Sequence, residues 1–330
     1  MKHFFAFLIT MFTLTGNMVG QKTTQPVIVI HAGAGTIARG LLTDSTELLI
    51  RSALQEALDA GYKVLADGGT SMDAVEEAIL VLENAPHFNA GKGSVMTNIG
   101  THELDASIMD GSNRDAGAVA GVTTVRNPIK AARAVMLKSP HVMLVGEGAN
   151  KFSKEQGLEQ VENSYFTTSS VQKRWEESHK TEGHHSENSR FSKFGTVGCV
   201  ALDQNGNIAA GTSTGGMMNK KYGRIGDSPI IGAGTYADND NCGVSCTGHG
   251  EYFIRIGVAK EISDQMKFGG KTLKEAVDYT LSNSLGGLNA QGGIIALDKD
   301  GNFELVFNTP GMYRGFKTAV DQKVMIYKDE

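Results

Sequence analysis

The sequence predicts an α+β protein in which antiparallel sheets are covered by layers of helices. Two similar hairpin patterns, ALDQNGN at 201–207 and ALDKDGN at 296–302, each lie between apolar runs, which is typical of antiparallel strands. Amphipathic stretches of helix length and apolar runs of strand length also occur in blocks. A parallel sheet would instead show a strict alternation of strand and helix, so layers of sheet and helix are expected.

The composition is that of an ordinary globular chain. Its 330 residues are 40% hydrophobic and 20% charged, with a formal net charge of −5, which is enough for one large domain or two small ones. This charge balance gives no sign of the clustered basic surface that a nucleic-acid partner needs. We expect Cys199, Cys242 and Cys246 to be free and buried, because four residues of strand separate the last two by roughly 13 Å.

The first twenty residues have the features of a secretory signal. Lys2 and His3 form a short basic start, residues 4–14 are mostly apolar, and small and polar residues follow. The apolar run is shorter than the about 20 residues that cross a bilayer. We therefore predict a signal peptide at 1–20 and an exported protein, periplasmic or secreted; an N-terminal core helix is the alternative.

Element signals in the first half of the chain are clear. The β-branched run at 27–30 predicts a buried strand that enters the glycine loop HAGAG. Helical spacing predicts a helix over 45–66, and Thr70 with Asp73 caps a second helix that runs to about Asn84. Strands are expected at 117–125 and 141–145, and a helix begins at Asn127-Pro128.

Residues 151–194 differ in composition from the rest. They are rich in Ser, Glu, Lys, Gln and His, and the segment SHKTEGHHSENSRFSK has too few apolar side chains to order itself. We interpret this stretch as a disordered linker that ends at a processing site. A surface insertion is the alternative.

Strand and turn signals resume at Thr196. Strands are predicted over 197–203 and 208–212, joined by a type I′ turn at Asn205-Gly206. The segment NCGVSC predicts another strand, 251–266 a helix, and Thr272 with Glu275 the cap of a further helix.

The pair Gly195-Thr196 is a candidate for a nucleophile created by self-cleavage. A threonine hydroxyl is a poor nucleophile unless a base takes its proton. Cleavage before Thr196 would free an α-amine with a pKa of about 7.7–8.0, which could be that base. Gly195 leaves room for the strained backbone of an N→O acyl shift. From the pattern alone, an ordinary strand start is the alternative.

The run GTVGCVALDQNGNIAAGTSTGGMMNKKYGRIGDSPIIGAGTYADN, followed by SCTGHGEYFIR, resembles the plant-type asparaginase / isoaspartyl peptidase family of N-terminal nucleophile hydrolases. The resemblance continues through HAGAGTI, FNAGKGS, HELDASIMDG, AGAVAGV and SPHVMLVGEG. It implies a four-layer αββα sandwich with antiparallel sheets between the helix layers. An α subunit (21–195) and a β subunit (196–330) would form one folded domain, and two such heterodimers the assembly.

The resemblance also implies the catalytic residues. Thr196 matches the nucleophile, and the Gly195–Thr196 bond matches the cleavage site. Thr214 matches a second threonine whose hydroxyl lies close to the nucleophile. Thr247 and Gly248 match an oxyanion hole, in which a hydroxyl and a backbone N–H stabilise the developing negative oxygen.

Substrate binding is implied chiefly for the motif RIGD. Arg224 matches the partner of the substrate α-carboxylate and Asp227 that of its α-amine, as expected for a guanidinium fork and a counter-charge. We interpret His249 as a loop residue that contacts the substrate region, and Gly250 as leaving room for the substrate. The other implied substrate-site residues are Asn89, Ile225, Gly226, Thr247 and Gly248.

No cofactor is implied for catalysis. The loop from Leu82 to Lys92 resembles a segment that holds a structural sodium ion on backbone carbonyls. The implied activity is that of an autoproteolytically activated threonine amidohydrolase acting on β-aspartyl dipeptides and L-asparagine, with no nucleic-acid or membrane partner. Glycosylasparaginase is the alternative within the superfamily, and an inactive binding homologue is the alternative of another class.

Overall fold

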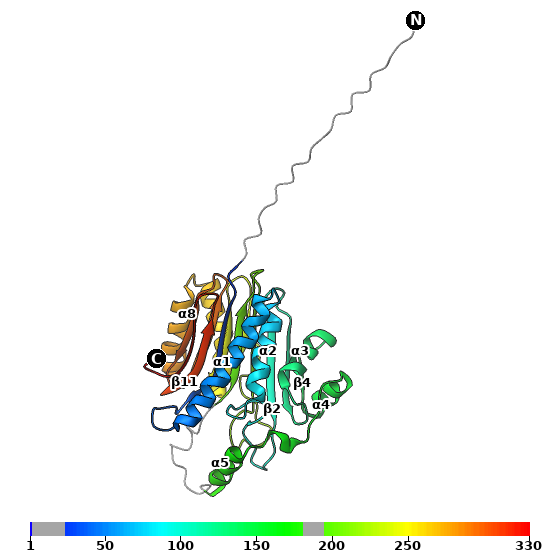
Figure 1. Ribbon diagram of the computed structural model, residues 1–330, viewed down its shortest axis with the longest axis vertical. Helices are drawn as coiled ribbons and strands as arrows, with labels where there is room; N and C mark the ends of the chain where they lie inside the picture. Colours follow the sequence, from blue (N-terminus) through cyan, green and yellow to red (C-terminus); the bar gives the residue numbers. More distant parts are fainter. Residues whose placement is uncertain (2–23, 181–194) are drawn as a thin grey trace.

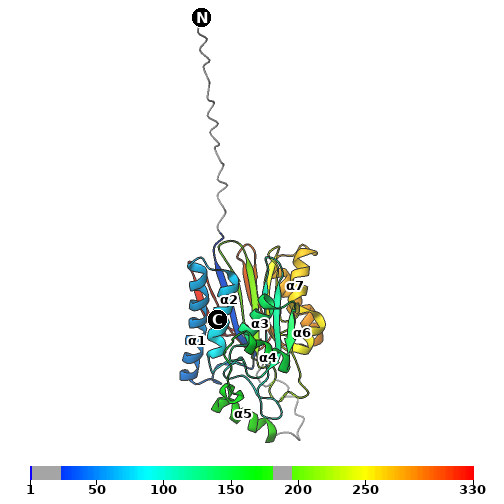
Figure 2. The same cartoon turned by 90° about the vertical axis from the view of Figure 1, so that its right-hand side faces the viewer.

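The computed structural model describes residues 1, 24–180 and 195–330 as two sheets stacked face to face between two layers of helices (Figure 1). Residues 2–20 of the predicted signal peptide and the last part of the predicted linker lie outside the described residues. Figure 2 shows the layers edge-on, with α1 and α2 on one side of the sheets and α6 and α7 on the other. The predicted αββα sandwich is confirmed.

The larger sheet has eight strands. They are β1 (Val27–Gly35), β2 (Leu104–Asp110), β3 (Ala116–Val122), β4 (Met143–Val145), β5 (Val197–Leu202), β6 (Ile208–Thr214), β11 (Gly311–Lys317) and β12 (Gln322–Tyr327). Their order is β12-β11-β1-β5-β6-β2-β3-β4. All neighbours pair antiparallel except β3 and β4, which are parallel. Strand β5 thus lies in the middle of the sheet, between β1 and β6.

The smaller sheet has four antiparallel strands in the order β10-β9-β8-β7. They are β7 (Thr235–Ala237), β8 (Cys242–Gly248), β9 (Gly292–Asp298) and β10 (Phe303–Phe307). Its inner face packs on β1, β5 and β6 of the larger sheet. The end of β8 and the start of β5 therefore belong to facing sheets.

Helices cover the two outer faces. On the larger sheet lie α1 (Asp44–Ala66), α2 (Ser71–Asn84) and α3 (Pro128–Lys138). On the smaller sheet lie α6 (Gly250–Ile256), α7 (Val258–Lys267) and α8 (Leu273–Tyr279), followed by the short turns η3 (Thr280–Leu285) and η4 (Gly286–Leu288). At the far edge of the larger sheet, α4 (Gly146–Glu155) packs on β3 and β4.

Strand periodicity divides the interior into two cores. Successive side chains of a strand point to opposite faces. In β1, Ile28 and Ile30 therefore pack under the helices of the larger sheet, whereas Val27 and Val29 pack between the two sheets. The central strands are buried on both faces, which explains why their sequences are nearly continuous apolar runs.

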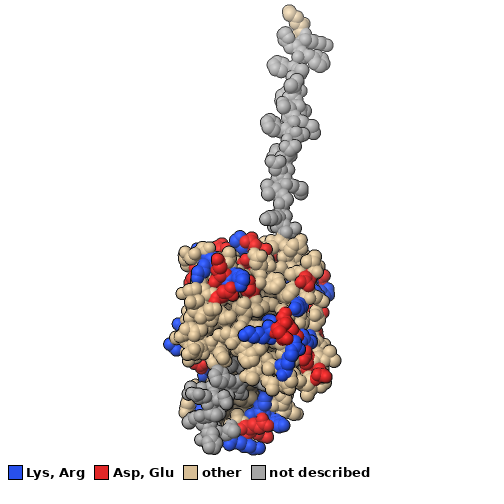
Figure 3. All heavy atoms as spheres, turned by 90° about the vertical axis from the view of Figure 1, so that its left-hand side faces the viewer, with Lys and Arg blue, Asp and Glu red and all other residues tan. Residues whose placement is uncertain are grey.

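Most predicted elements are confirmed, including the caps. The Thr70 side chain accepts a hydrogen bond from the Asp73 N–H (3.1 Å), and Thr272 with Glu275 forms a full capping box. All three cysteines are free and buried. Among the described residues, no helix has both the length and the apolar character needed to cross a bilayer. On the face in Figure 3, acidic and basic side chains lie interspersed.

The prediction of disorder from 151 onward is wrong for residues 151–180. This stretch holds the end of α4, a 3-10 turn η1 (Asn163–Phe166) and helix α5 (Ser169–Lys180). Phe166 and Val171 are fully buried, and the Trp175 indole donates to the Thr97 carbonyl at 2.7 Å. A few well-placed large side chains therefore order a segment whose average composition is polar.

Three local predictions need correction. The 203–207 turn is not type I′, because Gly206 but not Asn205 has a positive φ; Asp203 N donates to Asn207 O, giving a three-residue loop. The HAGAG segment is not a loop, since β1 runs through it with a register shift between His31 and Ala34. The predicted 251–266 helix is divided into α6 and α7 at Gly257, which has a φ of 70°.

The division of α1 into a buried and an exposed face gives a stability prediction. Leu54 is fully buried against the larger sheet, whereas Leu48 on the same helix is 69% exposed. In a Thr196→Ala background, used so that the protein remains one chain, Leu54→Ala should lower the free energy of unfolding by about 2–5 kcal/mol. Leu48→Ala should change it by less than about 0.5 kcal/mol. Urea unfolding followed by circular dichroism checks both, and equal losses would contradict the packing described here.

Candidate active site

Thr196 lies directly before β5, in the centre of the larger sheet. The β5–β6 register pairs Val197 with Ser213, which brings Thr196 beside Thr214. The Thr196 hydroxyl donates to Thr214 Oγ1 at 3.0 Å, and Thr196 is buried, with 7% of its surface exposed. Thr214 Oγ1 also accepts from the Gly216 N–H at 2.9 Å. Two hydroxyls from neighbouring strands are thus held in contact in the interior.

The carbonyl group of Gly195 receives two hydrogen bonds. Asn89 Nδ2 donates to it at 2.7 Å and Thr214 Oγ1 at 3.2 Å. Asn89 is itself fixed, since its Nδ2 also donates to Gly216 O and its Oδ1 accepts from Val95 N, both at 2.8 Å. A Cβ on residue 195 would lie 2.8 Å from Asn89 Cβ, so the close approach requires glycine. Donors in these positions polarise the carbonyl of the Gly195–Thr196 bond.

A small cavity opens beside Thr196 and collects most of the predicted site residues. It is lined by Thr196, Thr214, Arg224, Gly226, Asp227 and Gly248. Asp227 is buried, and one of its carboxylate oxygens has no hydrogen-bond partner among the described residues. Burial raises the pKa of Asp227 to about 7, against the opposing charge of Arg224. A buried carboxylate oxygen without a donor is suited to an ammonium group.

Two of the three nitrogens of the Arg224 guanidinium already donate to a carboxylate of this protein, a contact that the sequence did not predict. Its Nε and Nη2 donate to the two carboxylate oxygens of Glu251 at 2.8 and 2.9 Å. The Arg224 hydrogen bond lowers the pKa of Glu251. The Nη1 side of the fork remains for a further acceptor. No local signal in the sequence links these residues, because 27 positions separate them.

Thr247 and Gly248 end strand β8 close to the same cavity. The Thr247 hydroxyl is fully buried and has no partner among the described residues. Gly248 lines the cavity, and a Cβ there would lie 2.5 Å from Gln291 O, directly before β9, and 2.7 Å from Gly292 Cα, so close packing against β9 requires this glycine. An unpaired buried hydroxyl costs free energy unless a ligand completes it. This position therefore suits an oxygen-bearing ligand.

Three of the predicted substrate-site residues, Ile225, His249 and Gly250, do not line this cavity. Ile225 is 37% exposed and does not line the cavity. His249 occupies the N-cap position of α6, and its Nδ1 accepts from Gln291 N at 3.3 Å, directly before β9; burial lowers its pKa. A Cβ on Gly250 would lie 2.8 Å from Arg224 Nη2 and 3.0 Å from Asp227 N. Gly250 therefore makes room for the RIGD segment, and the expectation that it leaves room for the substrate stays a prediction.

Sequence reasoning missed a layer of buried polar residues behind the cavity. Asp105 on β2 is buried, accepts from the Gly121 N–H at 2.8 Å, and has its pKa raised by burial. Lys220, also buried, lowers that pKa by its charge. Asp105 could have been found as a charged residue inside an otherwise apolar strand.

His31 is a second missed residue. Its Nε2 lies 3.0 Å from Ser245 Oγ, and burial lowers its pKa to about 3, so the ring is neutral. A Cβ on Gly198, the register partner of His31, would lie 2.4 Å from that nitrogen. Because the second residue of β5 is a glycine, the side chains of His31 and Ser245 can pack directly against the strand that follows Thr196.

In the segment from Leu82 to Lys92, whose first three residues end α2, two carbonyl oxygens lie close to Gly93. A Cβ on Gly93, whose φ is 94°, would lie 2.6 Å from Pro86 O and 3.1 Å from Phe88 O. Within the described part of the chain, no group of three or more His, Cys, Asp and Glu side chains could hold a metal ion. The oxygen donors of this loop suit a hard monovalent cation, which backbone carbonyls can hold in place of water.

Comparison with known proteins gives consistent matches along the whole described chain. The asparaginase family model matches residues 24–326. The isoaspartyl peptidase of Escherichia coli is 47% identical over 312 residues, covering 93% of this chain and 97% of that protein. The isoaspartyl peptidase/L-asparaginase of Xenopus laevis is 44% identical over 292 residues, covering 87% and 91%. The human protein of the same name is 40% identical over 288 residues, covering 87% and 92%.

Proposed function

The chain belongs to the asparaginase family, and from this premise we propose that it is a self-activating threonine amidohydrolase that hydrolyses β-aspartyl dipeptides and L-asparagine. The observation that carries the proposal is the buried contact of the Thr196 hydroxyl with Thr214, beside a doubly hydrogen-bonded Gly195 carbonyl. An enzyme of this type needs a hydroxyl, a base and oxyanion donors in one water-poor site.

Self-cleavage is the first proposed reaction. Thr196 Oγ1 attacks the Gly195 carbonyl carbon, a C–O bond forms, and the Gly195–Thr196 C–N bond breaks. The hydroxyl proton ends on the departing nitrogen, which becomes the α-amine of Thr196. Asn89 and Thr214 are positioned to stabilise the oxygen anion of Gly195. Water then hydrolyses the ester, leaving a carboxylate on Gly195 and a free Thr196.

Turnover uses the same hydroxyl with the new amine as its base. The α-amine takes the Oγ1 proton while Oγ1 attacks the side-chain carbonyl of the substrate. The buried Thr247 hydroxyl and the Gly248 N–H are the proposed donors to the oxyanion. The amide C–N bond breaks, and the proton moves to the leaving ammonia or amino acid. Water then releases aspartate from Thr196.

The two charged ends of the substrate are proposed to bind at RIGD. The unpaired carboxylate oxygen of Asp227 accepts from the α-ammonium group. The α-carboxylate takes the Nη1 side of Arg224, while Glu251 fixes the other side and so orients the guanidinium. Because Glu251 already fixes the Arg224 guanidinium and Asp227 is buried, few side chains lose conformational freedom when the substrate binds.

Further parts of the proposal rest on the sequence and its resemblance. We propose a signal peptide at 1–20 and export to the periplasm or medium, an α subunit ending at Gly195, and a dimer of αβ heterodimers. The Leu82 to Lys92 loop would hold Na⁺ on carbonyls such as those of Pro86 and Phe88, with a structural role only. N-terminal sequencing of the purified protein tests the signal cut and the internal cut together.

A three-substrate assay tests the activity. Purified protein should release amino acid from a β-aspartyl dipeptide and ammonia from asparagine. Turnover restricted to a glycosylated asparagine would instead identify a glycosylasparaginase. One uncut chain without turnover of any of the three would identify an inactive binding homologue.

Thr196→Ala should block both the internal cut and turnover, because it removes the attacking oxygen of each reaction. Intact-mass spectrometry should find a single chain and no product should form from asparagine. Thr196→Ser is the matched control, since it keeps a hydroxyl and an α-amine, and it should still yield two fragments. Fragments of normal size from Thr196→Ala would exclude Thr196 as the cleaving residue.

Arg224→Ala should weaken substrate binding while the internal cut proceeds. Loss of a charged hydrogen-bonding partner costs about 2–5 kcal/mol, or roughly 30- to 5,000-fold in kcat/KM, mostly through KM. Arg255→Ala, on the exposed side of α6, is the control and should retain normal kinetics. If Arg224→Ala stayed uncut, the residue would have a structural role in the precursor.

The raised pKa of Asp227 predicts a specific pH profile. Asp227 must be ionised to bind an ammonium group, so kcat/KM should fall as the pH falls through about 7. The Thr196 α-amine, with an ordinary pKa of about 7.7–8.0, must be neutral to act as the base. Its protonation therefore also lowers kcat/KM at low pH. The wild-type slope of log(kcat/KM) should therefore approach 2 below pH 7. Asp227→Asn should reduce kcat/KM and lower that slope to 1; equal slopes would argue against an ionised Asp227.

A further inference from the structure

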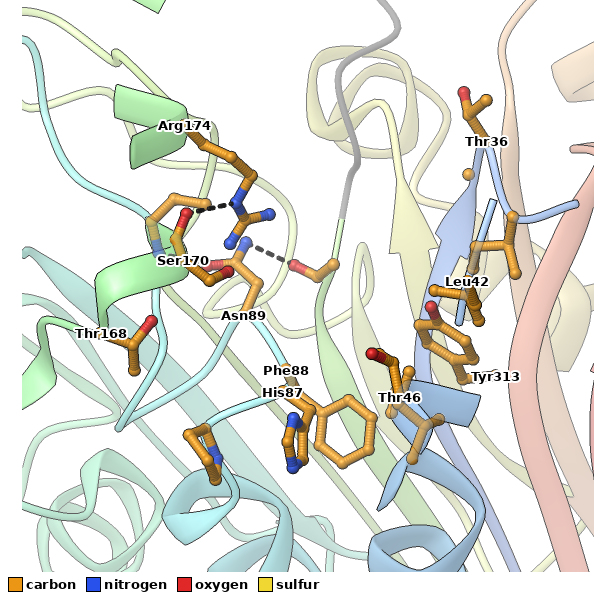
Figure 4. A pocket seen from close by; sticks show the side chains of 17 residues that line it. Thr36, Leu42, Thr46, His87, Phe88, Asn89, Thr168, Ser170, Arg174 and Tyr313 are labelled. Carbon is orange, nitrogen blue, oxygen red and sulfur yellow. Dashed lines mark hydrogen bonds between the residues drawn. The ribbon is translucent and has the colours of Figure 1, made fainter. Parts of the chain in front are cut away.

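A second, larger cavity also reaches Gly195. Its volume is about 400 Å³, within the usual range for small-molecule sites. It shares only Gly195 with the residues that line the cavity of Arg224 and Asp227. Both cavities therefore reach the backbone at Gly195, next to the bond before Thr196. Figure 4 shows the side chains that line this second cavity, among them Asn89, whose Nδ2 donates to Gly195 O.

Arg174 supplies the charge in this second cavity. In Figure 4 its side chain extends from α5 toward the cavity. Its Nε donates to Ser170 O at 3.3 Å within its own helix, and no carboxylate of the described residues lies within ion-pairing distance. The described lining also contains no Asp or Glu. A partly buried guanidinium facing a cavity without an acid is suited to a carboxylate ligand.

The position of α5 does not depend on Arg174. The neighbouring Trp175 donates to Thr97 O at 2.7 Å and lies against Gly100, where an added Cβ would be 3.3 Å from the indole. His179, one turn further on, lies 3.1 Å from Asn98 O through its Nε2. These contacts fix the helix on the 97–100 loop, so the guanidinium is free to serve a ligand.

The wall across from Arg174 is mainly apolar. It is formed by Ile37, Leu42 and Ile50 near the start of α1, by Phe88, and by Tyr313 of β11. The rings of Phe88 and Tyr313 are in contact, with centroids 6.1 Å apart. An apolar wall with a single cation opposite matches an amino acid that has an uncharged, apolar side chain and a free carboxylate.

We propose that this second cavity binds the leaving amino acid of a β-aspartyl dipeptide, with Arg174 holding its carboxylate and the apolar wall its side chain. This inference rests on the function proposed above. The aspartyl half binds at Arg224 and Asp227, its scissile amide lies at Thr196, and the leaving half extends past the position of Gly195. Asparagine, whose leaving group is ammonia, makes no use of the second cavity. Arg174 is thus a specificity-determining residue for the dipeptide reaction.

The test is a comparison of three substrates across Arg174 variants of the full, self-cleaved protein. The substrates are β-aspartyl-leucine, its C-terminal amide, and asparagine. Arg174→Met should lower kcat/KM for β-aspartyl-leucine roughly 10- to 100-fold, as expected for the loss of a charge-assisted hydrogen bond, mainly through KM. For asparagine and the amide, whose leaving groups carry no carboxylate, kcat/KM should change by less than about twofold. Arg174→Lys should restore part of the dipeptide activity.

Lys173→Ala is the matched control, because it removes a positive charge from the exposed side of the same helix and should leave all three substrates unchanged. Intact mass verifies that each variant is cut normally. Equal losses on all three substrates would show a structural role for Arg174 and overturn the inference, as would an unchanged dipeptide KM. Wild-type protein that hydrolyses none of the substrates would overturn the proposed function, and the inference with it.

Discussion

The hydrogen bond between the hydroxyls of Thr196 and Thr214 is the contact on which the site depends. It exists because β5 and β6 pair in one register, with Val197 opposite Ser213. A slip by one residue would turn every side chain of β5 to the other face, and the cores above and below the sheet would both lose their fit. Burial of the strand on two sides therefore fixes the position of one hydroxyl. The large apolar interior serves the chemistry by excluding alternative registers.

Burial in this interior also costs free energy for two polar groups near the site. Within the described part of the chain, one carboxylate oxygen of Asp227 and the hydroxyl of Thr247 are buried without a hydrogen-bond partner. Such groups destabilise a folded chain unless something completes their hydrogen bonds. Both lie at the cavity end of the facing sheets, where a ligand with an ammonium group and a negative oxygen would satisfy them. The pattern of unmet hydrogen bonds thus describes the ligand more specifically than the shape of the cavity does.

Most elements could be predicted from local signals in the sequence, and the family resemblance indicated most of the residues that the structure brings together around the cavity. Cap residues such as Thr70 and Thr272 mark helix starts, and motifs such as RIGD carry their residue types together. What it could not predict are contacts made across long separations. Glu251 on Arg224 and His31 beside Ser245 depend on how the sheets stack. Average composition also misled at 151–180, since the order of α5 depends on single large side chains and not on the mean.

Two different sets of donors lie around Thr196, and this separation has a consequence for how one hydroxyl can serve two reactions. In the uncut chain the Gly195 carbonyl oxygen lies toward Asn89 and Thr214. The unpaired hydroxyl of Thr247 belongs to the facing sheet. The proposed precursor and substrate carbonyls would therefore be polarised by different groups while sharing one attacking oxygen. Asn89 and Thr214 can therefore be oriented for the oxyanion of the self-cleavage step, and Thr247 for that of turnover. Neither set of donors has to move between the single maturation event and the repeated turnovers that follow it.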